Sequence, residues 1–162
     1  MVDVAALVIV VLTVAAVMIR KTSAGVGIMS LLAGVMLDQL LGSWVLAMIP
    51  RSDALAGQYV TVVVHLILTF APVVAALSAV KVRKHNQVLS LLASLTLGFL
   101  IIFFGLKIVA PLPEVAEAAK NSGLLHFLDP YQNTILAGSA VLGVAEMVLS
   151  SNKKSDEKDK KK

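Results

Sequence analysis

Hydrophobic residues fall into five long runs along the chain, at residues 4–19, 25–49, 57–80, 86–110 and 134–150, with short polar segments between them. At about 1.5 Å per helical residue, the middle three runs are long enough to cross a hydrocarbon core of about 30 Å. The first and last runs are near the lower limit. The pattern predicts an all-α, polytopic membrane helix bundle of about five transmembrane helices.

Composition strengthens this prediction. Hydrophobic residues make up 58% of the chain, and its mean hydropathy is +0.90, whereas soluble domains contain roughly 45–50% apolar residues. We expect residues 1–150 to form one transmembrane domain, and residues 151–162, which are polar and rich in lysine, to form a disordered cytoplasmic tail. The chain has no cysteine, which excludes disulfides, thiolate nucleophiles and cysteine-ligated metal centres.

The basic residues predict the orientation. Eleven of the 14 Lys and Arg residues follow the first, third and fifth runs, so the positive-inside rule puts the N-terminus outside and the C-terminus in the cytoplasm. The net charge of +4 is therefore explained by topology and anionic lipid, and it does not indicate a nucleic-acid partner. The residues assigned to topology and lipid contact are Arg20, Lys21, Lys81, Arg83, Lys84 and Lys107.

Two segments need separate interpretation. A cleaved signal peptide is an alternative to the first span, but Asp3 stands where a basic n-region is expected and the basic residues follow the apolar run. The loop before the fifth run predicts a short helix over residues 114–120, followed by an interfacial patch with Phe127 and Tyr131.

An aspartate, Asp38, lies in the middle of the second run, where a charge costs roughly 2.5–3.5 kcal/mol on insertion scales. Ser30, Gly34, Asp38 and Gly42 are spaced by four and share one helix face. Small residues allow close approach of membrane helices, so this stripe is expected to face a neighbour, with the carboxylate pointing inward.

The third run has a second polar face, made of Thr61, His65 and Thr69. Counted from the outer ends, His65 lies about 12 Å deep and Asp38 about 16 Å deep, so they can be partners if their helices touch. Further small-residue positions assigned to helix packing lie in the fourth and fifth runs: Ser90, Ser94, Gly98, Ser139 and Gly143.

For Asp38 and His65, two interpretations stay open. They form a hydrogen-bonded packing pair that sets the helix register, or they belong to a proton or ion relay with the hydroxyls of Thr61 and Thr69. Lys107 is expected to extend to the headgroups without a partner. Glu146 is expected to be interfacial.

Further expectations concern Glu146, two glycines and a loop histidine. Glu146 can meet Lys153 or Lys154 at the inner end. The glycines Gly25 and Gly27 are expected to let the second helix start close to the first. His126, a lone loop histidine, is interpreted as an interfacial residue rather than a ligand.

Enzymatic motifs are missing from the sequence. It contains no HExxH, GxSxG or GxxxxGK[ST] motif, so protease, hydrolase and ATPase activities lack the groups they need. We expect a non-enzymatic protein with no catalytic, cofactor-binding or metal-binding residue. Its expected partners are the lipid bilayer and either further copies of itself or other membrane proteins.

The layout resembles that of the colicin V production protein family of small bacterial inner-membrane proteins. Asp3, Arg20, Ser30 and Leu31 hold places that match the start of that family, and "RKHNQVLSLLASLTLGFLIIFFGL" and "NSGLLHFL" resemble later segments. Two departures are Lys21, where the family has a glycine, and the incomplete glycine pattern around Gly98. The resemblance implies a multi-pass inner-membrane protein for toxin export or envelope homeostasis, without an assigned catalytic residue.

Three functions are therefore compatible with the sequence. The first is a non-enzymatic protein that assists export or envelope homeostasis through partners. The second is a passive proton or ion conduit at Asp38 and His65. The third is a holin-like pore former, suggested by small size, several spans and a lysine-rich tail.

Overall fold

The computed structural model describes residues 2–20, 22–49, 54–79, 87–113, 115, 116, 123 and 129–159. This part of the chain forms five long helices and no strand. The helices are α1 (Val2–Arg20), α2 (Ala24–Met48), α3 (Ala54–Ala79), α4 (Gln87–Val109) and α7 (Gln132–Asp159), and a short 3-10 helix, η1 (Asp129–Tyr131), precedes α7. The predicted all-α class is confirmed.

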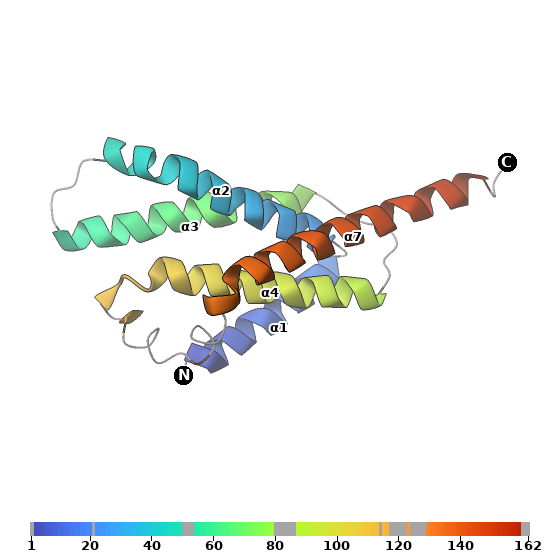
Figure 1. The fold of residues 1–162 in the computed structure, drawn as a ribbon, viewed down its shortest axis with the longest axis horizontal. Coiled ribbons are helices and arrows are strands. Elements are labelled where there is room, and N and C mark those ends of the chain that lie inside the picture. Colours follow the sequence, from blue (N-terminus) through green and yellow to red (C-terminus); the bar gives the residue numbers. More distant parts are fainter. Residues whose placement is uncertain are drawn as a thin grey trace.

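Consecutive helices run antiparallel (Figure 1). At one end of the bundle α1, α3 and α7 begin and α2 and α4 end, and we call it the Lys107 end. At the opposite end, called the Ser23 end, α2 and α4 begin and α1 and α3 end. Helix α2 packs on α3, α7 and α4, while α1 packs on α4. Helices α2 and α4 are therefore the centre of the bundle.

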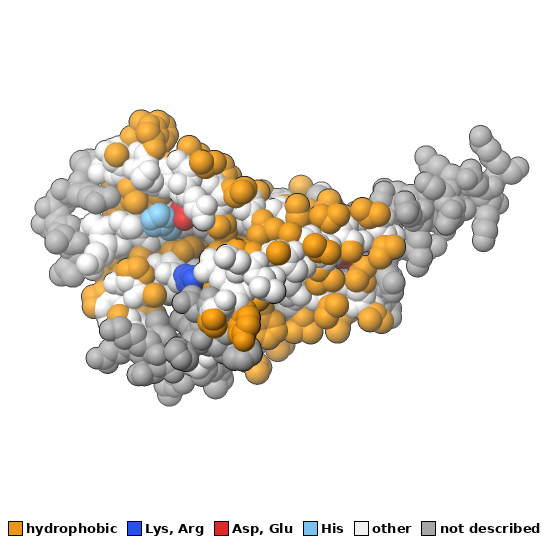
Figure 2. Space-filling view, viewed as in Figure 1, with side chains coloured by type: hydrophobic (Ala, Val, Ile, Leu, Met, Phe, Trp, Pro, Cys, Tyr) orange, Lys and Arg blue, Asp and Glu red, His pale blue; other side chains and the backbone are white. Residues whose placement is uncertain are grey.

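The core and the outer surface of the bundle are both apolar. Buried side chains from α1, α2, α3 and α4 form one cluster around Ile28, Leu31, Leu97 and Leu100. On the outside, Ile19 is 80% exposed and Leu40 is 75% exposed, and Figure 2 shows hydrophobic side chains along the whole described face. Apolar exposure on this scale is atypical of soluble monomers.

Four helical segments have the length and composition of membrane spans: Ala24–Met48, Gly57–Ala79, Val88–Val109 and Gln132–Leu149. The apolar part of α1 among the described residues, Leu7–Ile19, is shorter. This is the architecture of a multi-pass membrane protein.

Small residues of the predicted stripes lie at the helix contacts. A Cβ on Gly34 would collide with the backbone of Thr69 on α3. A Cβ on Gly98 would lie 3.2 Å from the Cα of Val10 on α1, and one on Gly143 would lie 3.3 Å from the carbonyl oxygen of Gly25. The absence of side chains at these points lets three pairs of helices approach closely.

Gly25 and Gly27 were expected to lie against the first helix, and this expectation is wrong. Gly25 faces Gly143 and Glu146 of α7, and Gly27 faces Leu97 of α4. The reason is the position of α1, which packs on α4. The glycines at the start of α2 are thus enclosed by α3, α4 and α7.

Helix α7 continues as far as Asp159, into the segment from Ser151 for which disorder is expected. No glycine or proline follows Gly143. Extending an existing helix costs little compared with nucleating one, and Lys and Glu are good helix formers.

Several predicted residues lie outside the described part or have no described side chain. Of the 114–120 helix, only residues 115 and 116 are described, where the amides of Val115 and Ala116 both donate to the carbonyl of Leu112. Tyr131 is 54% exposed. The remaining such residues are Asp3, Arg20, Lys21, Lys81, Arg83, Lys84, His126, Phe127, Lys153 and Lys154.

The contact of Gly34 with Thr69 predicts the effect of adding a side chain. Gly34→Leu should lower the free energy of unfolding by about 1–3 kcal/mol, because overpacking forces α2 and α3 apart. Gly138→Leu is the matched control, since nothing lies within 4 Å of its Cβ position. The measurement is the midpoint of SDS unfolding in mixed micelles, followed by circular dichroism. Equal midpoints for the two variants would contradict the packing argument.

Candidate functional site

The two polar faces of α2 and α3 meet at Asp38 and His65, whose Oδ1 and Nδ1 atoms lie 2.6 Å apart. Asp38 is ten residues before the end of α2, which puts it about 15 Å along the helix axis from that end. His65 is eleven residues after the start of α3, or about 16 Å from it. The pair therefore lies near the middle of a membrane about 30 Å thick.

The close approach of α2 and α3 makes this contact. A Cβ on Gly42 would lie 3.1 Å from Cε1 of His65 and 3.2 Å from Oδ1 of Asp38. Gly34, two turns earlier on the same face, lies against the backbone of Thr69. Glycines on both sides of Asp38 thus bring the imidazole within hydrogen-bond distance of the carboxylate.

The pair is open to the outside of the bundle. The His65 side chain is 30% exposed and the Asp38 side chain 19% exposed. Helices α2 and α3 diverge from α4 toward the Lys107 end (Figure 1). On this face, a histidine and an acidic side chain appear together at the surface (Figure 2). Each side chain is the hydrogen-bond partner of the other, but both remain accessible to a third group.

The threonines of the same face do not extend the pair. Thr61 donates its hydroxyl to the carbonyl of Gly57, 2.8 Å away on its own helix. Thr69 is 1% exposed, and its backbone contacts Gly34 of α2. The structure therefore brings together Asp38 and His65, but neither hydroxyl continues a proton path from them.

Lys107 has a partner within the bundle, contrary to the expectation. Its Nζ donates to Oε1 of Gln132 at 2.6 Å and lies 4.8 Å from the centroid of the Phe103 ring, a cation–π contact. The reason is the start of α7, which lies beside the end of α4 and brings an amide oxygen within reach. No pattern in the sequence identified Gln132.

Glu146, which was expected near the inner end of its helix, is buried, with 2% exposure. Its Oε2 accepts the hydroxyl of Ser23 at 3.1 Å and the backbone N–H of Gly25. The first turn of α2 contains no acidic residue, and its amides need acceptors and favour negative charge. A carboxylate from α7 supplies both. The predicted pairing with Lys153 or Lys154 involves side chains outside the described part of the structure.

The serines of the predicted stripes are mostly buried. Ser94 and Ser139 are 0% and 2% exposed, and each donates to a carbonyl three residues earlier in its own helix. Ser90 is 1% exposed, with no hydrogen-bond partner for its hydroxyl among the described residues. Ser30 is half-buried. The buried serines therefore act at the contacts mainly through their small size.

Metal binding finds no support in the described part of the chain, which contains no group of three or more His, Asp or Glu side chains that could hold an ion. The arrangement at Asp38 and His65 can bind a proton. It can also form hydrogen bonds, as donor or acceptor, with a polar group of another segment.

The buried carboxylate of Glu146 predicts a loss of stability on its removal. Glu146→Ala should lower the free energy of unfolding by about 1–3 kcal/mol, because it leaves buried donors of Ser23 and Gly25 without their acceptor. Glu146→Gln keeps a carbonyl oxygen and should lose less. Val148→Ala, at a position 51% exposed on the same helix, is the control and should stay within about 0.5 kcal/mol of the parent. An unchanged SDS-unfolding midpoint for Glu146→Ala would contradict the capping role.

Comparison with known proteins identifies no relative of this chain. No family model, no curated protein and no solved structure matches the chain. A functional conclusion therefore depends on the bundle itself and on the polar pair at membrane depth.

Proposed function

We propose that the protein is a non-enzymatic, multi-pass subunit of a cell inner-membrane assembly that assists export or envelope homeostasis. In this proposal the surface around Asp38 and His65 is where a partner segment binds. The observation that carries it is a polar pair near mid-membrane that is accessible from outside the bundle.

The cost of polar groups in lipid supports this role. A carboxylate at the centre of a membrane helix usually faces protein or water, because exposure to hydrocarbon is expensive. Asp38 and His65 are partly exposed, so a second transmembrane segment or a further copy that covers them removes this cost. Polar side chains that hydrogen-bond across helices are a known source of membrane-helix association.

A second polar contact lies toward the Lys107 end. Lys107 and Gln132 join α4 to α7, and Figure 2 shows a basic side chain on the same face as the histidine and the acidic side chain. Both contacts are therefore available to a partner that approaches this face. The sequence resemblance to colicin V production proteins agrees with a role in export or envelope homeostasis.

A passive proton conduit is the second candidate. It is favoured by the 2.6 Å contact between a carboxylate and an imidazole, two groups suited to proton exchange. It is weakened by the threonines, since Thr61 bonds to its own helix and Thr69 is buried. The partner-binding role needs no such path.

The partner-binding role predicts a complementation result. Deletion of the gene should sensitise cells to envelope stress such as detergent, and the unmodified gene should restore resistance. Asp38→Asn and His65→Ala should restore it about tenfold less well, as expected from a loss of about 1.4 kcal/mol of binding. Val63→Ala, at a 51% exposed position of α3, is the control. The proposal fails if both polar variants, at equal membrane levels, restore full resistance.

A flux measurement separates the two candidates. Proteoliposomes loaded with a pH-sensitive dye and given a pH gradient should leak protons no faster than protein-free vesicles, because no proton path continues from Asp38 and His65 among the described residues. Flux that is present in the unmodified protein and lost in Asp38→Asn and His65→Ala, with helicity and reconstitution unchanged, would instead favour the conduit.

A further inference from the structure

Lys107 lies deeper in the bundle than its position near the end of its own helix indicates. It is two residues before the end of α4, but α2 and α4 run in the same direction (Figure 1), and Gly27 of α2 faces Leu97 of α4. Ten residues further along each helix, Lys107 is level with Leu37. Lys107 and Asp38 therefore lie at nearly the same depth, about one helical residue apart.

Gln132 belongs to the same level of the bundle. Helix α7 runs opposite to α2 (Figure 1), and a Cβ on Gly143 would lie 3.3 Å from the carbonyl oxygen of Gly25. Eleven residues from this contact along each helix, Gln132 is level with Met36. Gln132 is therefore within one helical turn of the depth of Asp38.

Four polar side chains, one from each of α2, α3, α4 and α7, thus share one depth, and we call them the polar layer: Asp38, His65, Lys107 and Gln132. Three to five residues toward the Ser23 end, each of these helices has an apolar residue in or against the central cluster, namely Val35, Phe70, Phe103 and Leu136. The polar layer therefore begins where the apolar cluster ends.

The polar layer carries charges of both signs on one face. With a neutral imidazole, the Asp38–His65 pair holds one negative charge, and the ammonium of Lys107 is positive. Figure 2 shows the histidine, the acidic side chain and the basic side chain on the same face. Lys107 and Gln132 are half-buried, and Gln39, next to Asp38, is exposed. Groups of opposite charge are therefore accessible from one side of the bundle.

The common depth of Asp38 and Lys107 makes this face complementary to itself. Two identical chains with the same orientation in a bilayer are related by a two-fold axis along the membrane normal, which keeps each residue at its depth. A carboxylate of one copy then meets an ammonium of the other only if both lie at the same depth. Asp38 and Lys107 fulfil this condition.

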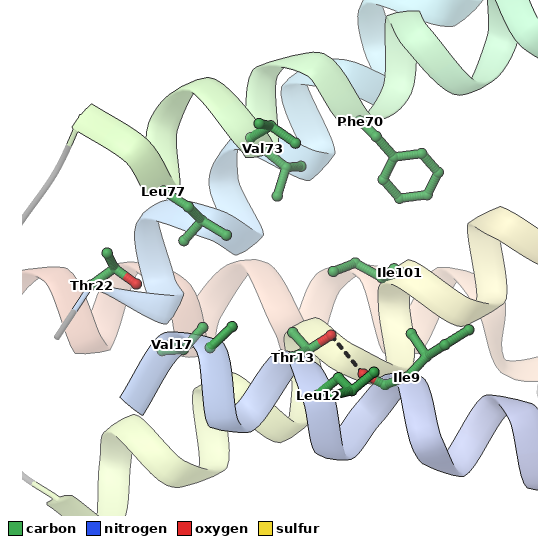
Figure 3. A pocket seen from close by; sticks show the side chains of 11 residues that line it. Ile9, Leu12, Thr13, Val17, Thr22, Phe70, Val73, Leu77 and Ile101 are labelled. Atoms are coloured by element: carbon green, nitrogen blue, oxygen red, sulfur yellow. Dashed lines mark hydrogen bonds between the residues drawn. The ribbon is translucent and has the colours of Figure 1, made fainter. Parts of the chain in front are cut away.

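The other open surface lacks such groups. An apolar groove lies between α1 and α3, and Ile9, Leu12 and Phe70 are among the residues that line it (Figure 3). The hydroxyl of Thr13 in this lining donates to the carbonyl of Ile9 at 2.8 Å, as the dashed line shows. None of the described lining residues is charged, so the groove gives a second copy no charge to pair with.

We propose that the partner at Asp38 and His65 is a second copy of the chain, related by a two-fold axis along the membrane normal, with Asp38 of each copy paired to Lys107 of the other. This inference rests on the proposed function, since it names the partner of that same surface. Ionisable side chains within a membrane usually pair with one another. The two reciprocal pairs remove the exposure of both charged groups in a single contact.

Dimer formation is measured by energy transfer between donor-labelled and acceptor-labelled full chains in phosphatidylcholine vesicles, over a range of protein-to-lipid ratios. The unmodified chain should dimerise. With about tenfold in the dissociation constant for each pair, Asp38→Asn or Lys107→Gln, which removes both pairs, should weaken the dimer about a hundredfold. Val141→Ala, at a 69% exposed position of α7, is the control and should leave the dimer unchanged. An unmodified chain that stays monomeric would overturn the proposal.

A mixture of the two variants separates contacts between copies from contacts within one chain. Asp38→Asn keeps Lys107, and Lys107→Gln keeps Asp38, so a mixed dimer retains one of the two pairs. With the donor on one variant and the acceptor on the other, the mixed dimer should be about tenfold tighter than either variant with itself. This recovery would also show that both variants are folded. A mixed dimer no tighter than the others would overturn the reciprocal pairing.

Cysteine cross-linking tests the position of the contact, because the chain has no cysteine of its own. Gln39→Cys in one tagged copy and Gln132→Cys in another should form a disulfide under mild oxidation, since Gln132 bonds to Lys107. In the control, Val63→Cys replaces Gln39→Cys. Val63 is 51% exposed, but it lies about 200° round α3 from His65, so the control should lose most of the cross-link. Equal cross-linking of both combinations would overturn the placement at the polar layer.

The dimer and the proposed function fail in different ways. A monomeric chain whose Asp38→Asn variant still does not restore envelope resistance would overturn the second copy and leave the partner role to another protein. A dimer that is lost in Asp38→Asn while resistance is fully restored would support the second copy and contradict the proposed function.

Discussion

The close backbone approach of α2 to its neighbours is the constraint on which the rest of the bundle depends. In lipid, apolar side chains gain little by leaving one hydrocarbon environment for another, so helices associate through tight packing and polar contacts. Helix α2 supplies both. Gly34 lies against Thr69 of α3, and Gly25 lies against Gly143 of α7. A side chain at either glycine would separate helices that now touch at the backbone.

The same approach creates two carboxylate contacts among the described residues. At one end of α2, Glu146 from α7 reaches the amide of Gly25 and the hydroxyl of Ser23. About three fifths of the way along α2, Asp38 reaches His65. Their surroundings differ: Glu146 is 2% exposed, while the Asp38 side chain is 19% exposed. The first carboxylate is therefore a structural cap, and the second is available to another molecule.

These contacts leave the two outer sides of the bundle with different chemistry. The side of the Asp38–His65 pair offers hydrogen bonds and charge near mid-membrane. The groove between α1 and α3 is apolar and ends at Thr22. The first surface suits the proposed partner segment, whereas the second offers mainly apolar contacts. The groove follows from α1, which packs mainly on α4 and makes few contacts with α3.

Much of this was predictable because hydrophobic length and i, i+4 spacing are local properties: the helices, the small-residue face at Gly34 and Gly42, and the matching depths of Asp38 and His65. The neighbour that each helix face contacts was not predictable from the sequence. The sequence indicated neither Gln132 as the partner of Lys107 nor Glu146 as the cap of α2, a contact between residues 123 positions apart. Only the tertiary structure decided these helix pairings. An apolar helix face gains little hydrophobic free energy by leaving lipid, so its partner is decided by close packing or by a hydrogen bond with a specific neighbour.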